Sequence, residues 1–286
     1  MNLDNSENHA HQQIAASFVA ALPSKLHRIK AFQDNYLWML QDPASRLCWV
    51  VDPGDAQAII ETVVSQALEL TGILLTHHHA DHQGGVEELL VWAARRGIAL
   101  KIYGPRDERI HAAAQGVGGA DYLDLGFTSA RVIEVPGRGD CLFAAGCGRI
   151  FEGNPRQMLD SLARLCELPE DSLICCAHEY TLSNLRFAKA AYPSHEAIEA
   201  RLLEAETLRA QDLPTVPSLL KHELISNPFL LGLVPGSPLH DESACLLTDS
   251  AGKRLPVQKL TGDLHSADAK LERFAALRAW KNEFRA

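Results

Sequence analysis

Short apolar segments alternate with amphipathic ones over the first two-thirds of the chain, and this alternation limits the possible folds more than any other feature. The segments that predict strands lie at residues 26–40, 46–51, 73–75, 100–103, 130–135 and 173–177, and the first two segments that predict helices lie at 56–70 and 84–95. Such alternation is typical of α/β proteins, in which helices cover a sheet. It therefore predicts an α/β core.

The last third of the chain has a different pattern. Helices are expected at residues 182–191, 198–210 and 268–284, with a Pro-rich irregular stretch at 213–260 between the last two. We therefore expect three parts: a flexible N-terminal tail at 1–27, an α/β domain at 28–181, and a smaller, mostly helical domain at 182–286.

Composition excludes several classes of protein. The chain has 286 residues and a formal net charge of −9, without long basic runs, so we expect no binding to nucleic acid or to an anionic membrane surface. The apolar stretch at 14–22 resembles a signal-peptide core, but Asp4 and Glu7 precede it and no Lys or Arg does. The seven cysteines are an odd number and none has C-x-x-C spacing, which favours reduced thiols and a cytoplasmic location.

The segment Thr76-His77-His78-His79-Ala80-Asp81-His82 carries the strongest chemical signal. It follows an apolar strand and precedes the turn Gly84-Gly85. On an extended backbone His77 and His79 point the same way, whereas His78 points away from both. Imidazole and carboxylate groups gathered at a strand end suit a divalent metal such as zinc. The segment therefore predicts a metal site.

The pattern H-x-H-x-D-H after a strand resembles the metallo-β-lactamase superfamily, whose fold is an αββα sandwich. More narrowly, the chain is similar to the hydroxyacylglutathione hydrolase (glyoxalase II) family. The matching segments are AFQDNY (31–36), VDPGD (51–55), THHHADHQGGV (76–86), GDCLFAAGCGRIFEG (139–153), AHEYTLSNLRFA (177–188), LPTVPS, NPF and ALRAWKNEF. The GCGR-x-FEG and HEYT-x-x-N segments are more specific than the superfamily motif. The resemblance therefore extends from about residue 28 to the C-terminus.

This resemblance implies a catalytic site with two divalent metal ions per chain. The ions are expected to be zinc, with iron or manganese as alternatives that suit the same ligands. His77 and His79 would bind the first ion, and Asp81, His82 and His178 the second. Asp140 would bridge the two ions, and Asp81 and Asp140 would be the catalytic carboxylates. The alternatives without a metal are that His178 is an ordinary polar residue at a strand end and that Asp140 is a turn residue.

One segment departs from the family pattern. Family members carry H-T-x-G-H after a Pro-Gly pair, and this motif supplies a third histidine to the first metal. In this chain Pro136-Gly137 is followed directly by Arg138, Gly139 and Asp140, so that histidine is absent. Arg138 cannot replace it, because a guanidinium group has no lone pair to donate. We therefore expect the first metal to bind more weakly than the second.

The implied activity is hydrolysis of S-(2-hydroxyacyl)glutathione thioesters, with S-lactoylglutathione as the expected substrate in methylglyoxal detoxification. The resemblance places Arg149, Tyr180, Arg278 and Lys281 at the glutathione site. The last two are three residues apart on one helix and so share a face. Cys141 and Cys147 are expected to be packed thiols and not nucleophiles. We expect a monomer.

Two alternative functions stay open. One is a different hydrolase of the same fold, which would act on a lactone, phosphodiester or sulfur substrate. The other is a non-catalytic or weakly active paralogue that binds glutathione conjugates or a single metal, which the missing histidine motivates.

Overall fold

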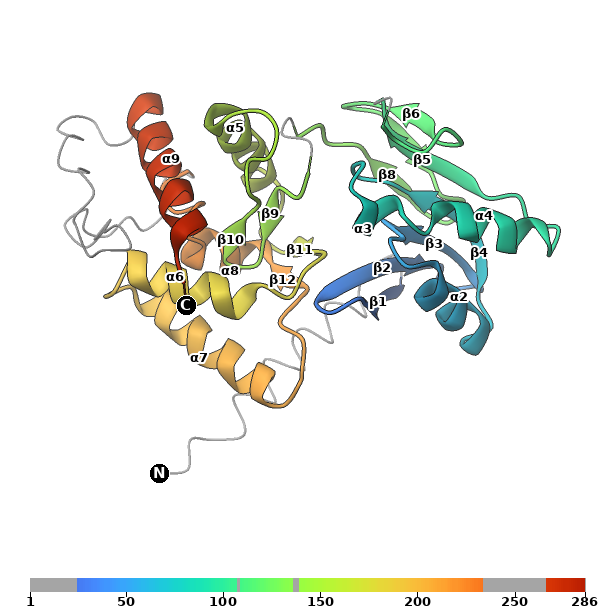
Figure 1. The fold of residues 1–286 in the computed structure, drawn as a ribbon, viewed down its shortest axis with the longest axis horizontal. Coiled ribbons are helices and arrows are strands. Elements are labelled where there is room, and N and C mark those ends of the chain that lie inside the picture. The colour runs from blue at the N-terminus through green and yellow to red at the C-terminus, as the bar shows by residue number, and fades with distance from the viewer. Residues whose placement is uncertain (1–24, 107–108, 136–138, 234–265, 286) are drawn as a thin grey trace. The chain divides into compact units, whose positions relative to one another are not determined.

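A computed structural model describes residues 25–106, 109–135, 139–233 and 266–285. The chain divides into two compact units, unit 1 at residues 1–133 and unit 2 at 134–286 (Figure 1). Because the relative placement of the units is not determined, each is described by itself. The functional boundary near residue 181 and the N-terminal tail stay predictions, and residues 1–24 of that tail lie outside the described residues.

Unit 1 is built on a six-stranded sheet in the order β1 to β6. The strands are β1 (Lys25–Ala31), β2 (Asn35–Gln41), β3 (Leu47–Val51), β4 (Glu69–Leu74), β5 (Lys101–Pro105) and β6 (Gln115–Val117). The first three strands are antiparallel neighbours, whereas β3 to β6 run parallel. Parallel neighbours need crossover connections. Here α2 (Ala56–Ser65) joins β3 to β4, and α3 (Ala80–Gln83) with α4 (Val86–Ala94) joins β4 to β5.

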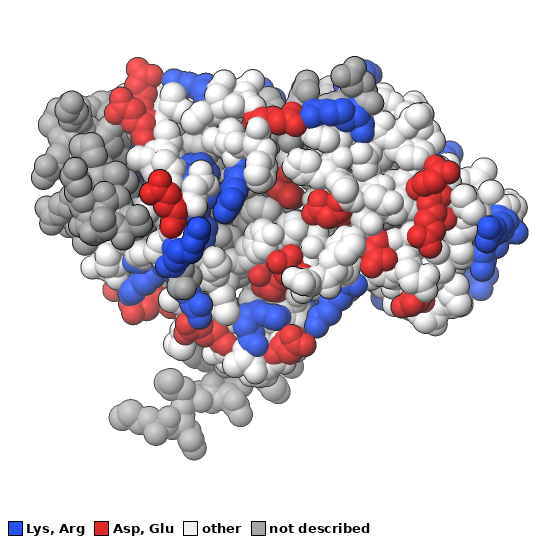
Figure 2. Space-filling model, in the orientation of Figure 1, with Lys and Arg blue, Asp and Glu red and all other residues white. Residues whose placement is uncertain are grey.

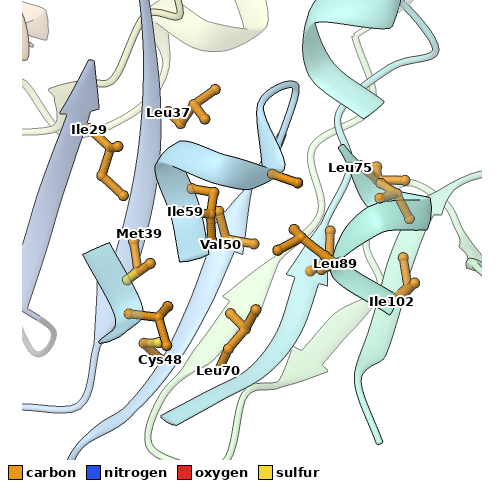
Figure 3. Close-up of a cluster of buried hydrophobic side chains, with 14 of the residues drawn as sticks. Ile29, Leu37, Met39, Cys48, Val50, Ile59, Leu70, Leu75, Leu89 and Ile102 are labelled. Atoms are coloured by element: carbon orange, nitrogen blue, oxygen red, sulfur yellow. The ribbon is translucent and has the colours of Figure 1, made fainter. Parts of the chain in front are cut away.

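The core of unit 1 lies between the sheet and these helices. Met39 and Val50 on the strands pack with Ile59 of α2 and Leu89 of α4, and all four side chains are fully buried (Figure 3). The other face of the sheet is covered by β7 (Tyr122–Asp124) and β8 (Ser129–Arg131). Burial on both faces fixes the carboxyl ends of the parallel strands, where α/β sheets present functional groups.

Unit 2 contains little sheet. Its strands are two residues long and form two pairs: β9 (Leu142–Phe143) with β10 (Gly146–Cys147), and β11 (Leu173–Ile174) with β12 (Ser218–Leu219). Its helices are α5 (Pro155–Cys166), α6 (Thr181–Ala191), α7 (Glu196–Ala210), α8 (Leu220–Ser226) and α9 (Ala267–Glu283). A core rich in aromatic side chains joins α5, α6 and α9. Side-chain packing therefore takes the place of strand pairing in this unit.

The α/β class with a helical C-terminal region is confirmed, but several local predictions are wrong. The strands expected at 130–135 and 173–177 end at Arg131 and Ile174. The helix expected at 56–70 ends at Ser65, because Ala67 adopts a left-handed conformation (φ 52°) and Glu69 begins β4. The stretch expected to be irregular at 213–260 contains α8. Residues 234–265 of that stretch lie outside the described residues, as do Pro136, Gly137 and Arg138.

Charged side chains of both signs are interspersed on the face shown in Figure 2. That face therefore carries no extended field of one sign. Within the described residues, none of the helices combines the length and hydropathy that a membrane crossing requires.

Candidate functional site

The histidine-rich loop leaves the carboxyl end of β4 and runs into α3. It packs closely on the turn that follows β3. A side chain at Gly54 would place its Cβ 1.9 Å from the carbonyl oxygen of Asp81, and the backbone N–H of Gly85 donates to the Pro53 carbonyl at 2.9 Å. Only glycine permits this approach. The VDPGD and THHHADH segments are thus held against each other at one sheet edge.

Three histidines of the loop converge. The Nε2 atom of His77 lies 3.0 Å from Nδ1 of His79, and the ring centroids of His77 and His82 are 3.9 Å apart. His77 and His82 are buried, with exposed fractions of 6% and 1%. The ring of His78 lies further from that of His77, at 6.4 Å, but its centroid is 4.9 Å from that of His79. The structure therefore brings together the predicted ligands of unit 1, and the non-ligand role of His78 stays a prediction.

Asp81 lies beside this group. Its Oδ2 atom accepts a hydrogen bond from Asn35 Nδ2 at 3.2 Å and lies 3.5 Å from Nε2 of His82. Asn35 belongs to the AFQDNY segment at the start of β2 and is itself buried. The amide thus orients the predicted catalytic carboxylate towards the histidines.

Asp52 is a functional residue that the sequence analysis did not identify. It follows β3, with φ 48°, and its carboxylate accepts from Thr76 N (2.7 Å) and Thr76 Oγ1 (2.6 Å) and lies 3.0 Å from His82 Nδ1. A proton held on Nδ1 by this carboxylate leaves the lone pair of Nε2 available to a metal, an arrangement common around bound zinc. The position of Asp52 directly after β3 could have indicated its role, because the carboxyl ends of the parallel strands β3 and β4 meet at one edge of the sheet.

The residues of unit 1 fit a divalent metal ion. One potential ligand atom from each of Asp52, His77 and His82 lies within 4.8 Å of the others, and two of the three side chains are buried. Because the Asp52 carboxylate contacts Nδ1 of His82, it supports that ligand, and the two histidines are the donors in this group. Neutral imidazole nitrogens and carboxylate oxygens are the donors that zinc, iron and manganese share. The donor set therefore supports a metal but does not distinguish among these ions.

Unit 2 brings the other two predicted ligands together. Asp140 Oδ2 lies 3.7 Å from His178 Nε2, although the two residues are far apart in sequence. The ring of His178 stacks on Tyr180 with centroids 4.7 Å apart and meets the edge of Phe143 at 5.8 Å. These aromatic contacts restrict rotation of the imidazole. The two predicted ligands of unit 2 thus form a second, compact group.

Lys281 on α9 is the most perturbed cation of the predicted glutathione site. Burial and the nearby positive charges of Arg278 and Arg149 lower the pKa of its ammonium group to about 8. Its Nζ donates to the carbonyl oxygen of Ser183 at 2.9 Å and lies over the rings of Phe187 and Phe284. A concentration of positive charge around a half-buried lysine favours an anionic ligand.

Arg278 lies deeper than the prediction implied. It is 5% exposed, and its Nη1 donates to the carbonyl oxygens of Cys147 at 2.7 Å and Gly148 at 3.4 Å. These bonds tie α9 to the β9–β10 hairpin. Its Nε is buried without a hydrogen-bond partner in the part of the chain that the structure describes. Contact between Arg278 and substrate stays a prediction, as it does for Tyr180, which is 38% exposed, and for exposed Arg149.

The thiols beside Asp140 are protonated near neutral pH. Burial raises the pKa of Cys141 to about 12 and that of Cys147 to about 11, the latter against the opposing effect of the Arg278 charge. Since the thiolate is the nucleophilic form, neither side chain is suited to attack a substrate. This agrees with their expected role as packed thiols.

Histidine and aspartate side chains converge at the strand ends of the sheet in this protein. This arrangement places it in the class of metal-binding α/β proteins. Sequence comparisons then place the chain more narrowly. It is 40% identical to the hydroxyacylglutathione hydrolases of Hahella chejuensis and Dechloromonas aromatica over 275 residues, covering 90% of this chain and 98% of each relative. It is 41% identical to that of Shewanella baltica. The family profile "Hydroxyacylglutathione hydrolase C-terminus" matches residues 179–284. The chain belongs to the hydroxyacylglutathione hydrolase family.

Solved structures with similar folds include ETHE1 from Myxococcus xanthus, which is 23% identical with a TM-score of 0.46 and aligns over 71% of this chain and 96% of its own. The BLEG-1 B3 metallo-β-lactamase is 20% identical with a TM-score of 0.43, covering 52% of this chain and 88% of its own.

Proposed function

We propose that this protein is a metal-dependent hydrolase of S-(2-hydroxyacyl)glutathione thioesters, with S-lactoylglutathione as its substrate. The observation that carries the proposal is the convergence of His77, His79 and His82 beside Asp81, in a chain of the hydroxyacylglutathione hydrolase family. The products are a hydroxy acid and glutathione. Such an activity would serve the detoxification of methylglyoxal.

Two divalent ions, which we propose to be zinc, fit the donor set. His77, His79 and Asp140 would hold one, and Asp81, His82 and His178 would hold the other, with Asp140 shared between them. Two bound metal ions would supply a hydroxide nucleophile near neutral pH and would polarise the carbonyl oxygen of the thioester.

The surrounding residues prepare these ligands. Asp52 keeps the proton of His82 on Nδ1, and Thr76 in turn holds the Asp52 carboxylate through its backbone N–H and its hydroxyl. Asn35 fixes one oxygen of Asp81. Preorganised ligands lose little conformational freedom when a metal binds. The chain therefore contributes geometry at the site, and no serine or cysteine nucleophile is required.

Substrate recognition is proposed for unit 2. Glutathione carries two carboxylates, which Lys281 and Arg149 would attract by charge, while Tyr180, which is 38% exposed, stacks on His178. Arg278 would act by holding α9 on the hairpin as well as by its charge.

Hydrolysis of S-lactoylglutathione by the zinc-loaded protein tests the proposal. Loss of thioester absorbance should follow enzyme concentration and should fall to the uncatalysed rate in the His79→Ala, Asp81→Ala double variant. Coenzyme A thioesters and lactones serve as competing substrates. Wild-type turnover no faster than that of the double variant would refute the proposed function, and equal turnover of all substrates would favour another hydrolase of this fold.

The missing histidine leads to a second proposal about the metals. The alignments with relatives run over 275 to 279 residues yet cover only 90% of these 286, so the relatives carry positions without a counterpart in this chain. With one donor fewer, the first ion should bind more weakly than the second, and activity should follow its occupancy. The positive charge of Arg138 would weaken binding of the first ion further if it pointed at the metal site; Arg138 lies outside the described residues.

We also propose a cytoplasmic monomer. All six cysteines in the described part of the chain are free thiols, which suits a reducing compartment. Light scattering coupled to gel filtration tests the monomer: a mass near 31.3 kDa supports it, and twice that value contradicts it.

A further inference from the structure

The β9–β10 hairpin links the proposed metal site to the proposed glutathione site. Asp140 lies just before its first strand and Arg149 just after its second. Beyond the paired strands, the N–H of Gly148 donates to the carbonyl oxygen of Cys141 at 3.1 Å, and a Cβ on Gly148 would lie 1.8 Å from the Asp140 carbonyl oxygen. The register of this hairpin therefore sets the backbone position of Asp140.

The hairpin is poorly suited to hold that register by itself. It has only two paired residues on each strand, and its turn is Ala144-Ala145. Ala145 adopts the left-handed conformation with φ 54°, which is unfavourable for any residue with a Cβ. A short hairpin with a strained turn needs support from outside.

That support comes from three buried side chains, Asn184, Glu223 and Asn227, which we name the hairpin clamp. Asn184 Nδ2 donates to the Ala144 carbonyl at 3.0 Å, and Glu223 Oε2 accepts from the N–H of Ala145 at 2.7 Å. Asn227 Nδ2 lies 3.2 Å from the Phe143 carbonyl and 3.0 Å from that of Gly146. Polar groups of all four consecutive residues, 143–146, are thus bound by the clamp.

The clamp is anchored by a buried charge. Glu223 is fully buried, and its carboxylate pairs with Arg201 and accepts from Ser218 Oγ at 2.7 Å and from Asn227 Nδ2 at 3.1 Å. An ionised acceptor makes stronger and shorter hydrogen bonds than a neutral one. The bond from the Ala145 N–H to this carboxylate is therefore well suited to hold the strained residue of the turn.

We propose that the hairpin clamp is a positioning device for Asp140: it fixes the hairpin register so that the carboxylate of Asp140 lies beside the other predicted ligand of unit 2, His178. The inference rests on the proposed function, in which Asp140 is a metal ligand. Asn184, Glu223 and Asn227 act through the backbone of residues 143–146 and do not touch substrate or metal. Metal ligands must be held to within about 0.5 Å, which makes the hairpin register decisive.

Zinc affinity of the full-length protein tests the clamp. Metal-free protein is titrated with Zn²⁺ in competition with a chromophoric chelator, at a temperature where circular dichroism shows each variant folded. Glu223→Gln should weaken zinc binding about tenfold or more, the scale of effects from residues that support metal ligands. Asn184→Ala, which removes one buried hydrogen bond to the hairpin turn, should weaken it about threefold or more. The same factors should appear in kcat at saturating substrate.

Ser218→Ala is the matched control, because it removes one buried hydrogen bond to the Glu223 carboxylate and none to the hairpin. Its zinc affinity should stay within about twofold of the wild type. Equal losses in Ser218→Ala and Asn184→Ala would overturn the clamp proposal. If Glu223→Gln does not fold, that comparison alone decides. Asp140→Asn distinguishes failure of the proposed function from failure of the clamp proposal. If Asp140→Asn leaves zinc affinity unchanged, the proposed function fails. If Asp140→Asn weakens zinc binding and Glu223→Gln does not, only the clamp proposal fails.

Discussion

The two predicted ligand groups of this protein are built in different ways. In unit 1, the histidine loop leaves a six-stranded sheet, and its ligands lie within six consecutive residues. In unit 2, Asp140 and His178 are 38 positions apart by number, and the strands near them are two residues long. Regular strand pairing positions the backbone of the first group, whereas the backbone of Asp140 in the second depends, in our proposal, on the buried side-chain hydrogen bonds of the hairpin clamp. The second group should therefore be far more sensitive to single polar substitutions outside the site.

The largest expected effect comes from the buried ion pair of unit 2. Arg201→Met would leave the fully buried Glu223 carboxylate without its cation, and breaking a buried pair in this way costs about 3–5 kcal/mol in the free energy of unfolding. Arg46→Met makes the same substitution in unit 1, where the Arg46–Glu69 pair is exposed, and should cost less than about 1 kcal/mol.

Urea unfolding of both variants measures the difference. Similar losses of stability for Arg201→Met and Arg46→Met would contradict the contrast between a side-chain-supported unit and a sheet-supported one.

A substitution at Asp52 removes the carboxylate that supports His82 in unit 1. Asp52→Asn should lower kcat/KM about 10- to 100-fold, because the amide no longer fixes the proton of His82 on Nδ1 as firmly. Asp42→Asn is the control: that carboxylate also accepts from a hydroxyl and a backbone N–H in unit 1, but it contacts no histidine. Steady-state kinetics with S-lactoylglutathione compares them, and equal effects would show that Asp52 only stabilises its turn.

The perturbed lysine of unit 2 predicts a pH dependence of binding. Because the pKa of Lys281 is lowered to about 8, the free protein loses this positive charge as pH rises through about 8. The dissociation constant of S-methylglutathione should therefore rise about fivefold between pH 7 and pH 9 beyond any change in the Lys281→Arg variant, whose cation stays protonated. Calorimetric titration at both pH values measures it, and parallel pH profiles would exclude Lys281 as the titrating group.

The same pKa shift has a consequence for stability. The unfolded chain binds a proton at this lysine up to pH 10.5, whereas the folded chain releases it near pH 8. The unfolded state therefore holds more protons between these values, so the contribution of Lys281 to stability is unfavourable at neutral pH and improves as pH rises through that window.

The smallest expected effect is at the start of α5. The Asn154 side chain accepts from the N–H of Gln157 at 3.0 Å, and Gln157 Oε1 accepts from the N–H of Asn154 at 3.1 Å. Asn154→Ala should cost about 1 kcal/mol in the free energy of unfolding without changing zinc affinity. A parallel loss of zinc affinity would show that helix packing, and not the hairpin clamp alone, controls Asp140.

What the sequence predicted well was local. The histidine loop is contiguous, and α5 begins at an Asn154-Pro155 pair, the residue order that capping preferences favour at a helix start. The end of α2 was missed because the left-handed residue there is Ala67 instead of glycine, so nothing in the sequence marks the termination. Structural features set by a short segment can be predicted from that segment, unless a residue there departs from the usual conformational preferences, as Ala67 does.

The roles of Glu223 and Asn227 could not be predicted. Their partners at residues 143–146 lie about 80 positions away along the chain. Glu223 lies in α8 and Asn227 directly follows that helix, in a stretch without clear helical periodicity. A lone Glu in such a stretch normally predicts solvent exposure. Long-range hydrogen bonds of this kind leave no local pattern, which is why the support of Asp140 is visible only in the structure.

The central claim is that His82 and His178 are both metal ligands, and metal retention tests it most directly. After zinc loading and exhaustive dialysis, the wild type should keep one tightly bound equivalent per chain, whereas His82→Ala and His178→Ala should each keep none, because each variant lacks one proposed ligand of that ion. A full equivalent retained by His178→Ala would contradict the claim, since the ion would then be bound by unit 1 alone. Two equivalents retained by the wild type would contradict the predicted weakness of the first site.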